Sequence, residues 1–198
     1  GGYTSAVFTD ASVTNGISYY YVVSASNATG ESAGSSEVSA TPGANVLAGN
    51  VVWSGMTGNA WDTTALNWQQ SGAVVLYQDG NRVLFDDSSG PNTSVNLSAI
   101  RSPSAVTFNN GWRSYALTGS AINCPGALLK AGNGPLSITG TNTFVDGAVL
   151  AGGRTTIQNV NSLGTGSLTL TGGTLCTSGD MTLSRNISVS GGGGISLG

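Results

Sequence analysis

Short apolar triplets recur along the second half of the chain, separated by turns rich in glycine and asparagine. In Leu136-Ser137-Ile138 and Leu168-Thr169-Leu170, two apolar residues flank one polar residue. Other triplets of the series include 95–97, 106–108, 128–130 and 181–183. This alternation predicts short strands that bury one face. Most triplets follow one another after about 7 to 12 residues, so two or three strands would form a coil of roughly 20 to 25 residues. Such periodicity predicts an all-β solenoid, a parallel β-helix.

The pattern divides the 198 residues into three segments. Residues 1–43 read as two strands around the turn-forming segment 27–32. Residues 44–198 form the β-helix module, with tryptophan-rich first coils over 44–92 and repeats over 93–198. Three of the four tryptophans, Trp53, Trp61 and Trp68, fall within 16 residues.

Two segments carry a family resemblance. Residues 134–144 (GPLSITGTNTF) and 161–175 (NSLGTGSLTLTGGTL) resemble the repeat unit of autotransporter-associated β-strand repeat proteins. The tryptophan-rich entry through Phe85-Asp86-Asp87 is also similar to the region before such repeats. The resemblance spans about residues 50–198 and implies a right-handed parallel β-helix. It departs from the family at the turn formed by Phe144-Val145-Asp146-Gly147-Ala148.

The first segment resembles the last two strands of a fibronectin type III domain. The runs 15–23 (NGISYYYVV) and 37–42 (EVSATP) carry this resemblance, over about 40 residues. An isolated hairpin is marginally stable in water. We therefore expect this hairpin, if ordered, to pack on the adjoining segment of the chain, as a cap.

Composition narrows the function. The formal net charge is −3, charged residues make up 8% of the chain, and there is no histidine. These properties argue against nucleic-acid binding, a polybasic membrane patch and any imidazole-based chemistry. A single lysine and many Thr, Ser, Gly and Asn residues suit a secreted or cell-surface protein. The start at Gly1-Gly2-Tyr3 lacks a signal peptide, and we expect the chain to be a piece of a longer protein.

Catalytic and metal-binding equipment is sparse. The neighbouring carboxylates of Asp86 and Asp87 read best as solvated turn acids, and no Cys-x-x-Cys spacing indicates zinc. We therefore expect neither an enzyme nor a cofactor. Cys124 and Cys176 lie two or more coils apart, so we expect two free thiols in the core.

Aromatic side chains are the better functional signal, because exposed rings stack on sugars. The candidate ligand-binding residues are Trp112, Tyr115, Trp61, Trp68, Tyr77, Asp62, Arg113 and Asn67. A competing interpretation places Trp53, Trp61 and Trp68 in the core or in a cap over the first coil. We expect Trp112 and Tyr115, in a turn-rich polar context, to be exposed.

Three functions compete. The first is a non-catalytic carbohydrate-binding module of a secreted bacterial polysaccharide-degrading enzyme. Its partners would be a polysaccharide, with xylan as the first guess, and a covalently linked catalytic domain. The pattern is similar to β-helical modules attached to xylanases. The alternative is a structural stalk or adhesin passenger. An enzyme of the pectin-degrading type is the least favoured. The last coil would be an open sheet edge, which predicts an external cap or self-association.

Overall fold

The computed structural model describes residues 10, 12, 17–40 and 49–197. The chain divides into two compact units, residues 1–47 and 48–198, which are described separately. The proposed boundary at 43/44, and positions 15–16 and 41–42 of the fibronectin-like pattern, lie outside the described residues.

The first unit contains two short antiparallel strand pairs. Strand β1 (Tyr19–Tyr21) pairs with β4 (Val38–Ala40), and β2 (Ser26–Asn27) pairs with β3 (Gly30–Glu31). The side chain of Asn27 accepts a hydrogen bond of 2.9 Å from the backbone of Thr29, which forms the predicted turn. Nearly all the described side chains of this hairpin are exposed, so the hairpin buries little apolar surface of its own.

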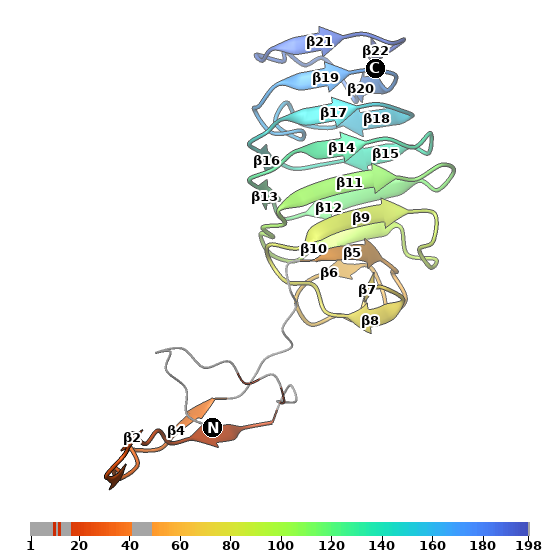
Figure 1. The fold of residues 1–198 in the computed structure, drawn as a ribbon. Coiled ribbons are helices and arrows are strands. Elements are labelled where there is room, and N and C mark those ends of the chain that lie inside the picture. The colour runs from red at the N-terminus through yellow and green to blue at the C-terminus, as the bar shows by residue number, and fades with distance from the viewer. Residues whose placement is uncertain (1–9, 11, 13–16, 41–48, 198) are drawn as a thin grey trace. The chain divides into compact units, whose positions relative to one another are not determined.

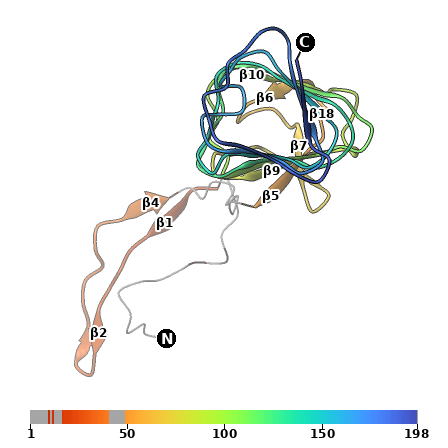
Figure 2. The same cartoon turned by 90° about the horizontal axis from the view of Figure 1, so that it is seen from above.

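The second unit is a parallel β-helix of about six turns, which confirms the predicted fold class (Figure 1). Viewed along its axis, the successive coils superimpose in a closed outline (Figure 2). One sheet contains nine strands, β5 (Asn50–Trp53), β7 (Trp68–Gln70), β8 (Ala73–Val75), β9 (Arg82–Asp86), β11 (Ala105–Asn109), β14 (Leu128–Lys130), β17 (Ala148–Leu150), β19 (Leu168–Leu170) and β21 (Ile187–Val189).

The opposite sheet contains seven strands, β6 (Ala60–Trp61), β10 (Ser94–Leu97), β12 (Tyr115–Gly119), β15 (Leu136–Ile138), β18 (Arg154–Ile157), β20 (Thr174–Thr177) and β22 (Gly194–Ser196). A short third side holds β13 (Asn123–Cys124) and β16 (Thr143–Phe144), which pair in parallel. The predicted strand at 181–183 is wrong, because this segment has no strand in the structure.

The register explains the core. Val83 pairs with Val106, 23 residues later, and Leu168 pairs with Ile187, 19 residues later, in agreement with the predicted coil length. Because neighbouring strands share a register, inward side chains form columns along the axis. One column begins with Phe85 and Phe108, whose rings stack with centroids 4.4 Å apart.

Lys130 occupies a position in this apolar column, between Phe108 and Leu150, and is fully buried. Its amine donates hydrogen bonds to the carbonyls of Gly132 and Gly152, at the corner where the chain leaves the sheet. Burial lowers the pKa of this amine to about 8. The negative charge of Asp87 partly opposes this decrease. A cation thus stands where the neighbouring coils place hydrocarbon.

The first coil is covered by its own chain. Strand β7 runs antiparallel to β5 on the edge that faces away from β9, and β8 pairs antiparallel with β7. Trp61 and Trp68 are fully buried beneath this cover, with ring centroids 5.2 Å apart. The interpretation of these tryptophans as core or cap residues is therefore confirmed.

Candidate functional site

Four of the predicted ligand-binding aromatics are buried and cannot stack on a ligand at the surface. Trp61, Trp68, Tyr77 and Tyr115 each expose 2% or less of their surface. The prediction that Tyr115 is exposed is wrong, because its ring fills the core against Phe85 and Phe108. Its hydroxyl donates a 2.7 Å hydrogen bond to the carbonyl of Asp86, which gives the buried phenol a polar partner in a turn-rich context.

The hydroxyl of Tyr77 donates a 2.9 Å hydrogen bond to Asp79. Burial raises the pKa of Tyr77 above its usual range, and the Asp79 carboxylate adds to this rise. The ring itself packs on Trp61, with centroids 5.3 Å apart. Tyr77 therefore helps to close the first coil, whereas the sequence pattern predicted it as a ligand-binding residue.

Two polar residues of the predicted site serve the backbone. Asn67 is buried; its side-chain oxygen accepts hydrogen bonds from Thr57, and its amide donates to Ala60. The Asp62 carboxylate accepts hydrogen bonds from the backbone amides of Thr64 and Ala65, at 2.8 and 2.6 Å. Burial alone would raise the pKa of Asp62, but these hydrogen bonds outweigh it and the pKa is lowered. Both side chains hold the loop between β6 and β7.

Trp112 and Arg113 are the two predicted site residues that the structure brings together at the surface. The indole of Trp112 is 69% exposed, as predicted. The guanidinium of Arg113 lies 4.7 Å from the centre of the Trp112 ring, in cation–π geometry. The same guanidinium donates hydrogen bonds to the carbonyls of Asp87, at 3.1 Å, and Gly90, at 3.0 Å.

The loop that carries Trp112 is fixed by one carboxylate. Asp87 accepts hydrogen bonds from the backbone amides of Gly111, Trp112 and Arg113, at 2.6, 3.3 and 3.0 Å. Desolvation opposes ionisation of Asp87, but these amides and the Arg113 charge together lower its pKa. A Cβ at Gly111 would lie 2.9 Å from the carboxylate, so glycine permits this close approach. The result is an exposed indole on an anchored turn.

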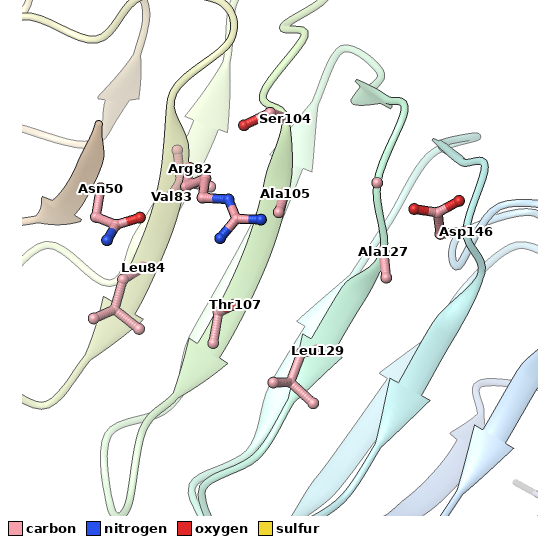
Figure 3. Close-up of a pocket in the computed structure, with 11 residues that line it drawn as sticks. Asn50, Arg82, Val83, Leu84, Ser104, Ala105, Thr107, Ala127, Leu129 and Asp146 are labelled. Atoms are coloured by element: carbon pink, nitrogen blue, oxygen red, sulfur yellow. The ribbon is translucent and has the colours of Figure 1, made fainter. Parts of the chain in front are cut away.

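A second surface was missed by the sequence interpretation. A shallow groove of about 570 Å³ lies on the outer face of the nine-stranded sheet (Figure 3). Ala105 and Ala127 lie on its floor, Gly126 also lines it, and Arg82 and Asp146 lie towards opposite ends. The available signal was the apolar residue at the outward position of some triplets, such as Leu129 in Leu128-Leu129-Lys130. At Leu129 the expected polar residue at the outward position of the triplet is replaced by an apolar one.

Other chemistry is limited in the described part of the chain. Within it, no group of three or more His, Cys, Asp or Glu side chains is arranged to hold a metal ion. Cys124 and Cys176 are buried free cysteines, as expected for core residues. Residues 10, 12, 17–40 and 49–197 contain no helix with the length and hydropathy needed to span a membrane.

Comparison with known proteins shows a likeness to a bacterial surface protein. The chain is 29% identical, over 174 residues, to the Adhesin BmaC autotransporter of Brucella suis biovar 1 (strain 1330). The match covers 71% of this chain and 5% of the adhesin. No protein-family model matches the chain, and no solved structure matches it.

The adhesin likeness agrees with the resemblance of residues 50–198 to autotransporter-associated repeats. The likenesses to fibronectin type III strands and to xylanase-attached modules stay predictions. Together, the parallel β-helix and the similarity to an autotransporter adhesin confirm the prediction of a secreted or cell-surface protein.

Proposed function

We propose that this chain is a segment of a non-enzymatic passenger of a bacterial surface adhesin, in which the β-helix holds contact surfaces away from the cell. The observation that carries this proposal is the similarity to an autotransporter adhesin over most of the chain. The fold suits the role, since each coil adds about 4.8 Å to the length of a rigid rod.

The disposition of the acidic residues also supports a non-enzymatic role. The carboxylates of Asp62, Asp79 and Asp87 all accept backbone hydrogen bonds from neighbouring turns. Carboxylates that accept such hydrogen bonds are occupied in maintaining loop structure, whereas a general acid needs a raised pKa. The pKa of Asp62 and that of Asp87 are both lowered.

The proposal is tested by adhesion. Beads coated with the full chain would be applied to cultured epithelial cells and to immobilised extracellular-matrix proteins, beside beads coated with an unrelated acidic β-protein of similar size. We expect more of the chain-coated beads to be retained under flow. Equal retention of the two bead types on all these surfaces would contradict an adhesive role.

A second candidate function is carbohydrate binding at Trp112, with xylan as the first ligand to try. It is favoured by the exposed indole on a loop that Asp87 anchors, because a pre-ordered ring binds a sugar face with little loss of conformational entropy. Only Trp112 and Arg113 of the original candidates support it at the surface, so a single ring would have to provide the stacking.

Affinity gels containing xylan, cellulose, mannan, β-glucan or pectin separate the two candidates. Retardation on one glycan that Trp112→Ala abolishes would establish the carbohydrate site. Tyr20→Ala is the matched control, because Tyr20 is 64% exposed but lies in the first unit. Unretarded migration on every gel would exclude these glycans and leave the adhesin passenger as the function.

A further inference from the structure

The groove on the nine-stranded sheet is built as a grid. The strand register aligns Arg82 on β9 with Ala105 on β11, and Ala127, the residue before β14, continues this row. It aligns Leu84, Thr107 and Leu129 in a second row, two residues further along each strand. The small residues of the first row leave the hollow, and the second row forms an aliphatic wall beside it (Figure 3).

The wall extends beyond the groove. The register continues the second row to Val52 on β5 and to Val149 on β17, and all its aliphatic side chains are partly exposed. The opposite sheet differs, because its outward row through Ala116, Ser137 and Thr156 is small and mostly hydroxylated. The packing of the solenoid core does not require aliphatic residues on the outer face. Because the aliphatic row lies on only one sheet, it indicates a surface that packs against a binding partner.

Charges lie at both ends of the groove. Arg82 and Asp146 are exposed, and the side chain of neither forms a hydrogen bond or ion pair with any residue that the structure describes. Asp146 precedes β17, three strands from β9, so the two charges are separated by about 14 Å along the axis. In Figure 3 they lie at similar heights along the strand direction, with the apolar floor between them.

We propose that this face binds a second copy of the same chain, with the two solenoid axes antiparallel. A two-fold axis that runs along the strand direction, midway between Arg82 and Asp146, places Arg82 opposite Asp146 of the partner subunit. The symmetry forms the same pair a second time. It also brings the two aliphatic rows against each other, as in sheet-on-sheet packing.

The contact is small. A patch four strands wide and about four residues deep measures on the order of 300 Å² per copy, well below the roughly 800 Å² per partner of a standard stable interface. Association is therefore weak in dilute solution and becomes effective where many copies are held close together, as on a cell surface. Its exposed ion pairs make it weaker at high salt.

Charge reversal tests both the surface and the symmetry. In the Arg82→Glu variant, the new carboxylate faces Asp146 of the partner subunit, and this repulsion occurs at two places in the dimer. In the Asp146→Arg variant, two Arg–Arg contacts replace the two ion pairs. We expect each variant alone to lose at least about tenfold in self-association constant at low salt. An equimolar mixture of the two variants forms two attractive pairs per dimer, so we expect heterodimers at close to the wild-type constant.

Sedimentation velocity over a concentration series measures the association, and native mass spectrometry distinguishes the heterodimer by mass. Arg154→Glu and Asp180→Arg are matched controls, because both residues are exposed and lie away from the groove. Thermal melts confirm that the surface variants fold. We expect the controls to associate like the wild type.

Four results would overturn the proposal. The wild type could remain monomeric at millimolar concentration and low salt. The single reversals could associate as well as the controls, or the mixture could fail to restore the dimer. Loss of association in Ile195→Lys, but not in Arg82→Glu, would assign the contact to the open last coil and reject this face.

Discussion

At the scale of single residues, the structure separates side chains that build the coil from those that face outward. The aromatic residues near the start of the second unit could be read as a binding platform or as a core, because composition does not report burial. Three-dimensional register decides the question: Trp61 and Trp68 lie inside, while Trp112 lies on a loop outside. The local polar context predicted the exposure of Trp112 but not the burial of Tyr115. The hydroxyl of Tyr115 donates its hydrogen bond to the carbonyl of Asp86, which is distant in sequence.

Lys130 shows the cost of a buried cation. Its pKa in the folded chain is about 8, below the ordinary value of 10.5, so between these pH values the unfolded chain binds more protons than the folded one. The free energy of unfolding therefore rises with pH across this window, and the full penalty is present below it. Sequence alone predicted an apolar triplet here without anticipating this conflict.

We expect Lys130→Met to stabilise the protein by about 1–3 kcal/mol at pH 7, because it replaces a desolvated charge with hydrocarbon of similar length. The gain should shrink as pH rises from 8 to 10.5. Urea denaturation at pH 7 and pH 10 measures both effects. An exposed Arg154→Met variant controls for the general effect of losing one positive charge. A Met variant that is less stable at pH 7 would show that the hydrogen bonds to Gly132 and Gly152 outweigh desolvation.

At the scale of elements, the apolar triplets located most strands of the stack, including β10, β11, β15 and β19. They succeeded because each strand is short and buries only alternate residues. A cap over the first coil was one interpretation of the tryptophans, but its strands β7 and β8 could not be located. Their antiparallel pairing with β5 depends on a chain reversal between Trp61 and Trp68 that leaves no periodic signal. Residues 181–183 follow the same pattern but form no strand in the structure.

We expect Trp68→Ala to destabilise the second unit by about 3–5 kcal/mol, since the indole is fully buried among three aromatic rings of the first coil. Thermal or urea unfolding followed by circular dichroism measures the loss. Trp112→Ala removes the same side chain from an exposed site and should change stability by less than about 0.5 kcal/mol. A Trp68→Ala variant that unfolds with the wild-type midpoint would show that the cover is dispensable.

At the scale of the whole β-helix, the two ends are unequal. The first coil is covered, whereas Val189, Ile195 and Leu197 in the last coil are 51, 45 and 73% exposed although they continue the register of buried residues or lie next to it. Whether that end binds a cap or another copy stays a prediction.

Stability should follow this asymmetry. In a solenoid, each coil is stabilised mainly by its neighbours, so a coil with one neighbour opens first. We expect backbone amides of β21 and β22 to exchange with deuterium at least about tenfold faster than those of β9 and β11, as measured by mass spectrometry on peptic fragments. The matched comparison is β5, the other terminal strand of the stack, which β7 protects. Uniform protection from β5 to β22 would contradict local opening at the last coil.

The continuous register also governs how such a chain can change in length. One residue inserted within a strand would turn every following inward side chain of that strand outward, and its column would be lost. Insertion or removal of a whole coil, about 20 residues as between Leu128 and Ala148, would preserve every column. Changes in the length of this protein during evolution should therefore occur in steps of entire coils. A coil gained between Arg82 and Asp146 would keep the fold intact while moving the two charges one step further apart.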